Sequence, residues 1–205
     1  MNLMLFHYHY WTPFVEETEI FYVANGFRIT QRIGKCEGAF QPFHPPLTWD
    51  DFREKQILFR IIEARKGNVN ITFGYGKKII FDHLGFLISP NDHEQICKNA
   101  SQLYWETNVG ERRTFIQTPY GFRIELQIHP DVIDPDTEFA SLEKLKLETK
   151  VEGLEHDLER LFGKPVVTIS TTLGEQTSIK EAVINGLRST NLMDPNGVRI
   201  VGTDA

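Results

Sequence analysis

Two histidines and a glutamate on three separate segments have the side chains needed to bind one metal ion. His83 and Glu125 alternate with apolar neighbours, Leu84 and Ile124, and His7 lies in an aromatic-rich segment. Alternate residues of a strand face opposite ways, so we expect all three side chains to face away from the packed core. Two imidazoles and one carboxylate match a facial triad, which leaves coordination positions open for water or substrate. The alternative is that the two histidines are partly buried residues with backbone partners.

Three successive segments predict the elements that would position these residues. Each has the order strand, helix and three strands, and the third shows it more weakly. The expected helices are 13–23, 92–100 and 152–162. The expected strands are 3–11, 27–33, 56–64, 68–73, 79–88, 103–108, 113–117, 122–128, 142–149, 166–171, 179–187 and 198–202.

A motif near the end of the second segment returns near the end of the third. Residues 118–124 read TPYGFRI and residues 194–200 read DPNGVRI, with proline, glycine, arginine and isoleucine in register. This match is the strongest sign of a repeat. It predicts an α+β fold built of repeated βαβββ units with strongly curved mixed sheets.

The repeat also predicts the domain organisation. Residues 1–130 are expected to form one domain of two paired units, 1–78 and 79–130. A linker at 131–139 precedes a degenerate third unit at 140–205. The first unit carries an insertion at 35–55, rich in proline and aromatic residues. Such a long loop is interpreted either as a lid or as a surface excursion that packs its own aromatic side chains.

The composition excludes several classes of protein. The chain has 205 residues, 40% of them hydrophobic, which is enough for a core, and a net charge of −6, which argues against binding to nucleic acid. No apolar run approaches the roughly 20 residues of a membrane span, and the first residues do not read as a signal peptide. Two cysteines without a spaced framework favour the cytoplasm over a secreted, disulfide-bonded fold.

The repeated unit resembles the vicinal oxygen chelate superfamily, which includes glyoxalase I, extradiol dioxygenases, and fosfomycin- and bleomycin-resistance proteins. His7 stands fifteen positions before Tyr22, the spacing that the family shows between its first ligand and an aromatic pair. His83 opens a segment, HLGFLIS, similar to the family's second-unit strand. The segment 118–125, TPYGFRIE, resembles the closing-strand signature whose glutamate binds metal. The resemblance therefore implies a divalent metal at His7, His83 and Glu125, with Fe, Mn, Ni, Co or Zn as candidates.

Two departures from the family limit the reactions that the resemblance implies. Asn70 stands where glyoxalase I has a fourth ligand, a glutamate, which argues against a glyoxalase reaction. Asn70 is instead a candidate to bind substrate or a metal-bound water, or is an ordinary polar residue. Phe115 replaces a tyrosine of the dioxygenases, and their other catalytic histidine has no clear match, so ring cleavage is in doubt.

Two function classes follow. The first is a metal-dependent lyase, isomerase, transferase or dioxygenase acting on a small oxygen-chelating molecule. In it His9 is a candidate general base, although it could also be an alternative ligand or a core residue, and Arg123 is a candidate anion clamp. The second is a metal-free pocket for a drug or aromatic molecule. Its expected wall consists of Trp11, Trp49, Tyr75 and Phe115. A degenerate protein with a structural role is a third possibility.

The third unit lacks the metal-binding residue types. Lys144 and Val201 occupy the positions that correspond to the ligand histidine and the ligand glutamate. Its sheet edge and concave face still need cover. We expect it to pair with its copy in a homodimer, or to close over the first two units.

Overall fold

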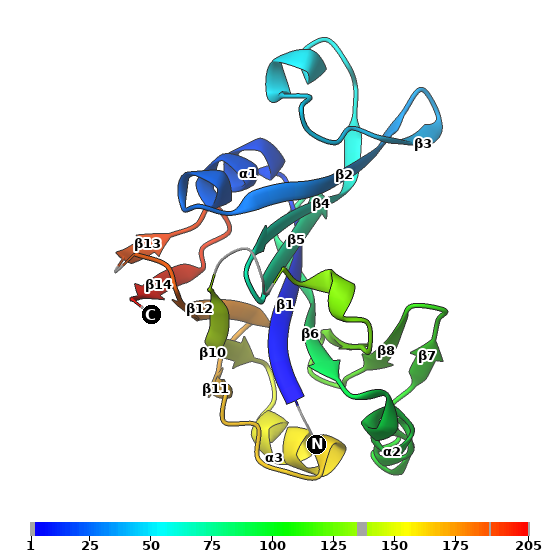
Figure 1. Ribbon diagram of the computed structural model, residues 1–205. Coiled ribbons are helices and arrows are strands. Elements are labelled where there is room, and N and C mark those ends of the chain that lie inside the picture. The colour runs from blue at the N-terminus through cyan, green and yellow to red at the C-terminus, as the bar shows by residue number, and fades with distance from the viewer. Residues whose placement is uncertain (1–2, 135–138, 189, 205) are drawn as a thin grey trace.

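The computed structural model describes residues 3–134, 139–188 and 190–204, which form two β-sheets with three helices (Figure 1). The first sheet has nine strands and the second has five. The α+β class is therefore confirmed. No helix in the described part of the chain is long and apolar enough to cross a bilayer.

The first sheet is built from residues 3–127. Its helices are α1 (Val15–Ala24) and α2 (Pro90–Gln102), and a 3-10 turn covers Trp49–Phe52. Its strands are β1 (Leu3–Thr12), β2 (Arg28–Cys36), β3 (Ala39–Pro42), β4 (Leu58–Lys66), β5 (Val69–Tyr75), β6 (Ile80–Ile88), β7 (Thr107–Val109), β8 (Arg113–Gln117) and β9 (Arg123–Gln127).

The order of these strands places the first segment of the chain in the middle of the sheet. The order is β3-β2-β4-β5-β1-β6-β9-β8-β7. β1 runs parallel to β5 and antiparallel to β6, and β6 runs parallel to β9. The strands that carry His7, His83 and Glu125 are therefore direct neighbours.

Two β-bulges interrupt the pairing of β1 with β6. Leu5 pairs with Phe86 and His7 with Gly85, so Phe6 is an extra residue on β1. On β6, Asp82 is extra between the residues that pair with His9 and Tyr10. A bulge shifts the alternation of faces, so two consecutive residues can face the same side.

The end of α2 differs from the expected pattern. A strand was expected at 103–108, but α2 continues to Gln102 and the next strand, β7, begins at Thr107. Tyr104 takes a left-handed conformation with φ of 59°, and the amide of Trp105 then donates to the carbonyl of Ala100 at 2.9 Å. This bond satisfies a free carbonyl of the last turn and turns the buried Trp105 back toward the core.

The second sheet contains β10 (Ser141–Thr149), β11 (Ile169–Leu173), β12 (Ser178–Asn185), β13 (Thr190–Met193) and β14 (Arg199–Thr203), and α3 (Leu154–Phe162) follows β10. Its strand order is β11-β10-β12-β14-β13. The strand β13 was not expected from the sequence, which carries no clear alternation there.

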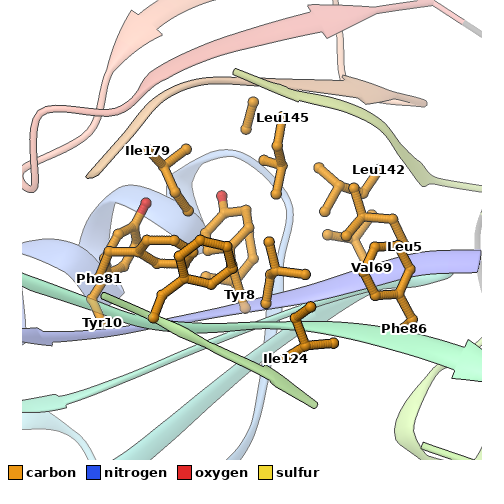
Figure 2. Packing of buried hydrophobic residues seen from close by; sticks show 14 of the residues in the cluster. Leu5, Tyr8, Tyr10, Val69, Phe81, Phe86, Ile124, Leu142, Leu145 and Ile179 are labelled. Carbon is orange, nitrogen blue, oxygen red and sulfur yellow. The ribbon is translucent and has the colours of Figure 1, made fainter. Parts of the chain in front are cut away.

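The second sheet packs against the first and shares its core. Figure 2 shows Leu145 and Ile179 facing Tyr8, Tyr10 and other residues of the first sheet. Of the two ways in which the third unit was expected to be covered, packing on the first two units is the one seen within the chain. It covers the tyrosine face of β1, which leaves the histidine face of the first sheet open.

Polar contacts also join the two sheets. The hydroxyl of Tyr22 on α1 donates to Asp194 at 3.1 Å, and Asn196 donates to Thr18 at 3.2 Å. The motif 194–200 therefore forms a turn that docks on α1. The oxygen Oδ1 of Asp194 accepts two backbone amides of its own turn, from Asn196 and Val198, each at 2.8 Å.

The insertion at 35–55 packs its own aromatic side chains. Phe43 and Phe52 are buried, and with Trp49 they pack around Phe59 of β4. Arg32 of β2 donates to the carbonyls of Phe43 and Leu47. The surface excursion is therefore the interpretation that fits the structure.

Candidate metal centre

His7, His83 and Glu125 lie together on the face of the first sheet that the second sheet leaves uncovered. Each offers one ligand atom, and the three atoms lie within 4.8 Å of one another. The Nε2 atoms of the two histidines are 3.0 Å apart, and Nε2 of His83 is 3.3 Å from Oε2 of Glu125. All three side chains are buried. The structure thus brings together the set expected from the sequence, from β1, β6 and β9.

Both imidazole rings are held by their other nitrogen. Nδ1 of His7 lies 2.8 Å from the backbone carbonyl of Asn70, and Nδ1 of His83 lies 2.6 Å from a carboxylate oxygen of Asp82. Both partners are acceptors, so each Nδ1 carries the proton and donates it. The two Nε2 atoms then present lone pairs toward the same point.

This arrangement fits a metal ion. Three acceptor atoms converge, and among the described residues Oε2 of Glu125 has no hydrogen-bond donor. Two atoms that each lie about 2.1 Å from one ion, at right angles, are about 3.0 Å apart. The distances of 3.0 Å and 3.3 Å are therefore suited to ligands of one shared ion. The donor set of two nitrogens and one oxygen suits Fe, Mn, Co, Ni or Zn.

The protonation states of the site favour a cation as well. Burial lowers the pKa of His7 from 6.5 to about 4, although the charge of Glu125 opposes this. Burial alone would raise the pKa of Glu125, but the adjacent imidazoles of His83 and His7 outweigh it and lower that pKa. At neutral pH the site therefore offers a neutral imidazole at His7 and a carboxylate, which are the ligand forms that metals bind.

His9 lies beside the three ligand candidates. Its ring stacks on that of His83, with ring centres 5.0 Å apart and planes 7° apart. Nδ1 of His9 lies 2.6 Å from the hydroxyl of Thr72, while Nε2 is buried with no partner among the described residues. Burial, then His83 and His7, lower the pKa of His9 well below 6.5. His9 is thus neutral at neutral pH, and its Nε2 lies beside the centre without a partner among the described residues.

A cleft of about 690 Å³ opens over the centre. Trp11, Phe115, Asn70, His9 and Arg123 all line it, as expected for the predicted site residues. Further lining residues that sequence reasoning did not assign to the site include Phe6, Arg60, Ile61, Glu63, Arg65, Asp82, Glu111, Asp131 and Val132. No residue from 35–55 lines the cleft, so the expectation of a lid is not met.

Two residues expected in the wall lie elsewhere. Trp49 and Tyr75 line a separate depression of about 380 Å³ beside α1 and the insertion. Tyr75 closes β5 beyond Gly74, and Trp49 lies in the aromatic cluster of the insertion. The expectation that they share a pocket with Trp11 and Phe115 is therefore wrong.

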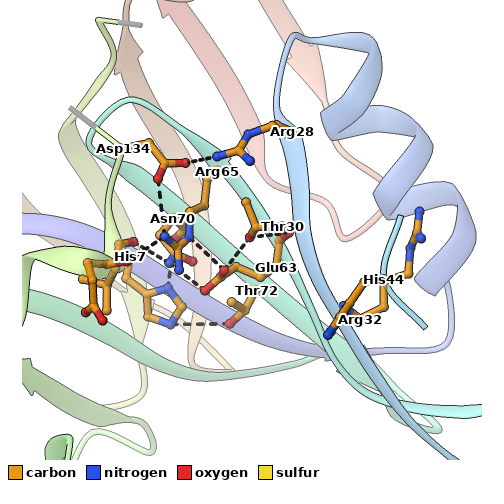
Figure 3. Close-up of polar contacts among 12 residues, drawn as sticks. His7, Arg28, Thr30, Arg32, His44, Glu63, Arg65, Asn70, Thr72 and Asp134 are labelled. Carbon is orange, nitrogen blue, oxygen red and sulfur yellow. Dashed lines mark hydrogen bonds and ion pairs between the residues drawn. The ribbon is translucent and has the colours of Figure 1, made fainter. Parts of the chain in front are cut away.

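Asn70 belongs to a polar network on one side of the centre, shown in Figure 3. Its Nδ2 donates to Glu63 at 3.0 Å and to the carbonyl of Val132 at 2.8 Å. Arg65 donates to the same Glu63 carboxylate at 2.8 Å. The side-chain oxygen of Asn70 has no partner among the described residues. Asn70 is therefore fixed through its nitrogen and keeps one acceptor free.

Arg123 is less available to an anion than expected. It lies over the ring of Phe115, 4.4 Å from the ring centre, and donates a short hydrogen bond to Asp82. Burial alone would raise the pKa of Asp82, but the hydrogen bonds from His83 and Arg123 lower it well below its usual range. The guanidinium is thus paired with a carboxylate of this chain.

Sequence reasoning missed Phe6 and Asp82, and the two bulges explain why. Regular alternation places Phe6 on the face opposite His7, and Asp82 on the face opposite His83. Each bulge instead lets two consecutive residues face the cleft. The sequence offers one signal for Asp82, a carboxylate directly before a candidate ligand, but alternation argues against using it.

No family model and no curated protein sequence matches the chain. Among solved structures, 2,2',3-trihydroxybiphenyl 1,2-dioxygenase from Sphingomonas wittichii is similar with a TM-score of 0.62 and 10% identity, over 100% of this chain and 91% of that one.

Two further structures are similar to the same extent. Homoprotocatechuate 2,3-dioxygenase from Arthrobacter globiformis has a TM-score of 0.61 and 11% identity, over 98% of this chain and 79% of that one. A mutant of 4-hydroxymandelate synthase from Streptomyces coelicolor has a TM-score of 0.58 and 11% identity, over 89% of this chain and 70% of that one. These enzymes are members of the vicinal oxygen chelate superfamily. This chain therefore shares its fold with these enzymes.

Proposed function

We propose that this protein is a divalent-metal-dependent enzyme that acts on a small molecule carrying two neighbouring oxygen atoms. The observation that carries the proposal is the convergence of three acceptor atoms, from His7, His83 and Glu125, at the floor of a cleft of about 690 Å³. Three protein ligands leave positions for substrate oxygens, which a purely structural site does not.

Each nearby residue has a defined task in this proposal. A bound ion would stabilise negative charge that develops on a coordinated substrate oxygen. His9 is neutral, and its free Nε2 can accept a proton from a substrate hydroxyl. Asn70 offers its free side-chain oxygen as an acceptor for a second hydroxyl. Trp11 and Phe115 add aromatic rings to the wall of the cleft, and the guanidinium groups of Arg60 and Arg123 lie over these rings.

An aromatic diol is the substrate class that we favour for this cleft. The similar structures include enzymes whose names specify catechol, trihydroxybiphenyl and homoprotocatechuate. Among the lyase, isomerase, transferase and dioxygenase reactions, we therefore favour dioxygenation. Phe115 on β8 has no group that can transfer a proton. In this proposal His9 on β1 is therefore the residue that accepts the proton.

Elemental analysis tests the proposal directly. Protein purified without a His tag or chelator should contain about one equivalent of Fe, Mn, Co, Ni or Zn, and His83→Ala should lose it. Absence of metal from both proteins would refute the proposed enzyme. Equal metal in both would refute the assignment of His83 as ligand.

The alternative, a metal-free pocket for a drug or aromatic molecule, has less support. It rests on Trp11 and Phe115 alone, because Trp49 and Tyr75 lie in a different depression. Thermal stabilisation of metal-free wild type by an aromatic ligand, together with absence of bound metal, would favour this alternative.

Residues 140–205 form the second sheet, which packs on the face of the first sheet opposite the candidate metal centre. We infer that residues 140–205 are a reduced pair of units rather than one degenerate third unit. β10 pairs parallel with β11 and antiparallel with β12, as β1 does with β5 and β6, and β12 pairs parallel with β14, as β6 does with β9. By this register Lys144 and Glu181 correspond to His7 and His83, so the metal set is incomplete there.

The homodimer expected from the sequence stays a prediction. Light scattering that shows a monomer over the whole accessible concentration range would contradict it. We likewise propose domain boundaries at 130 and 140, and a small-molecule substrate as the partner of the protein.

A further inference from the structure

Asp82 accepts hydrogen bonds from three side chains at the edge of the candidate metal centre. Its Oδ2 lies 2.6 Å from Nδ1 of His83 and accepts a short hydrogen bond from Arg123. Its Oδ1 accepts the indole N–H of Trp11 at 3.1 Å. The three donors come from β6, β9 and β1, which are the strands that also carry the ligand candidates. The carboxylate therefore ties the three strands together beside the centre.

The bulge on β6 makes this contact possible. In a regular strand, Asp82 and His83 would face opposite sides of the sheet. The bulge places the extra residue, Asp82, on the cleft side together with His83, while Phe81 and Leu84 still face the core. β-Bulges are common next to active sites, where they redirect a side chain. This bulge, which turns Asp82 toward His83, is therefore typical of a functional contact.

We propose that Asp82 is a positioning residue that holds His83 in the form with the proton on Nδ1 and the lone pair on Nε2. Arg123 and Trp11 hold Asp82 in turn, so the residue expected to bind substrate anions acts through Asp82 instead. This inference rests on the proposed metal site. Carboxylate partners of metal-binding histidines fix the ring and its tautomer, and their loss costs about 10- to 100-fold in metal affinity.

Replacement of Asp82 by alanine should release the tautomer. Alanine leaves Nδ1 of His83 without its carboxylate acceptor, so the ring proton can move to Nε2. Oε2 of Glu125, 3.3 Å from that Nε2, can then accept the proton in a hydrogen bond. The side-chain oxygen of an asparagine can still accept from both His83 and Arg123, so Asp82→Asn should keep the wild-type tautomer.

The experiment measures the tautomer and the metal affinity separately. Heteronuclear NMR of the histidine ring nitrogens in metal-free protein should show His83 protonated on Nδ1 in the wild type and in Asp82→Asn. Asp82→Ala, with no acceptor for Nδ1, should give a mixture of tautomers. Titration with Co²⁺ should show affinity lower by about 10- to 100-fold in Asp82→Ala, with Asp82→Asn closer to the wild type.

Asp131→Ala is the matched control. Asp131 is another cleft carboxylate paired with an arginine, Arg112, but it contacts no ligand candidate. Its loss should leave the tautomer of His83 and the Co²⁺ affinity unchanged. An unchanged tautomer in Asp82→Ala would overturn the inference, as would an equal loss of affinity in Asp82→Ala and Asp131→Ala. If the wild type binds no Co²⁺, the proposed function fails, while the tautomers of the metal-free proteins still decide the role of Asp82.

Discussion

At the residue scale, the site combines ligand candidates with one histidine whose role differs from theirs. His9 shares its face with His7, but its Nδ1 binds the hydroxyl of Thr72 and its free Nε2 does not belong to the cluster of three ligand atoms. The sequence left open whether His9 is a base, a ligand or a core residue. Our proposal makes His9 the base, because a ligand would have to converge with the other three atoms.

Substitution of His9 distinguishes a base from a ligand. His9→Phe keeps a ring to stack on His83 but removes both nitrogens. We expect full metal content and a turnover number lower by about 10²- to 10⁴-fold, because general acid–base catalysis contributes that much. Metal analysis and steady-state kinetics on the same preparation provide the measurement.

His93 supplies a matched control for this experiment. It lies on α2, and its Nε2 contacts Thr114 at 2.8 Å, outside the cleft. His93→Gln should change neither turnover nor metal content. Loss of metal from His9→Phe, in proportion to the loss of activity, would identify His9 as a ligand instead.

The ligand candidates could be predicted from the sequence because alternation within a strand is a local property. The apolar neighbours Leu84 and Ile124 are readily assigned to the core side of their strands. His83 and Glu125, next to them in sequence, must then lie on the opposite face. Asp82 could not be predicted, because a bulge depends on how two strands pair. Arg123 was predicted as a site residue, but its pairing with Asp82 was not, because the sequence does not show which carboxylate an arginine binds.

At the element scale, the pairing of β1 with β6 determines the geometry of the centre. Gly85 lies opposite His7, and a Cβ atom there would come within 2.9 Å of Cβ of His7 and 3.0 Å of the ring of Phe6. The close approach of the two strands at this point therefore requires a residue without a side chain. The imidazole of His7 occupies the space that the glycine leaves.

Gly85→Ala tests this packing. The added methyl group should displace the ring of His7, so we expect metal affinity to fall and the free energy of unfolding to drop by about 1–3 kcal/mol. Gly34→Ala is the control, because Gly34 lies on β2 and a methyl group there would crowd Ile57, directly before β4 and away from the cleft. Calorimetric metal titration should show weaker binding only in Gly85→Ala. Equal affinities in the two variants would show that His7 does not depend on this contact.

Element boundaries were predicted with unequal success. The middle strands were found because they alternate clearly, whereas β13 was missed and the strand before β8 was placed too early. Before β8, the chain continues as helix α2 to Gln102, because Trp105 docks into the core only after a left-handed turn at Tyr104. That turn reflects tertiary packing rather than the local preference of the sequence.

At the scale of the whole molecule, two sheets share one core, and a buried carboxylate lies where they meet. Asp194 is bound by Tyr22 from α1 and by two amides of its own turn. Burial raises the pKa of Asp194 above 3.8, although these hydrogen bonds oppose the effect. The repeated motif predicted this turn, but its docking on α1 required the fold.

The raised pKa predicts a pH-dependent stability. A carboxyl group whose pKa is higher in the folded state stabilises the fold below its unfolded pKa, and that contribution is lost as pH rises through the folded pKa. Asp194→Asn does not titrate. Its free energy of unfolding should therefore improve relative to wild type as pH rises from below 3.8 to neutrality. Urea unfolding at a series of pH values measures this difference.

Asp157→Asn is the control for loss of a tyrosine–carboxylate hydrogen bond. Asp157 accepts a hydrogen bond from Tyr120 at 2.8 Å, also between the two halves, but in a less buried place. A stability difference between Asp194→Asn and wild type that stays constant with pH would contradict the prediction.

The central place of β1 has a consequence for the order in which the chain acquires its structure. β1 leaves the ribosome well before its two neighbours in the sheet, β5 and β6, which begin only at Val69 and Ile80. Pairings between residues so far apart in sequence form slowly, because a long loop must close first. During synthesis, the segment that carries His7 and His9 therefore lacks its first neighbour until residue 75 has emerged and its second until residue 88 has emerged. The candidate metal centre is consequently assembled late, and a chaperone that shields the aromatic strand β1 would raise the yield of folded protein.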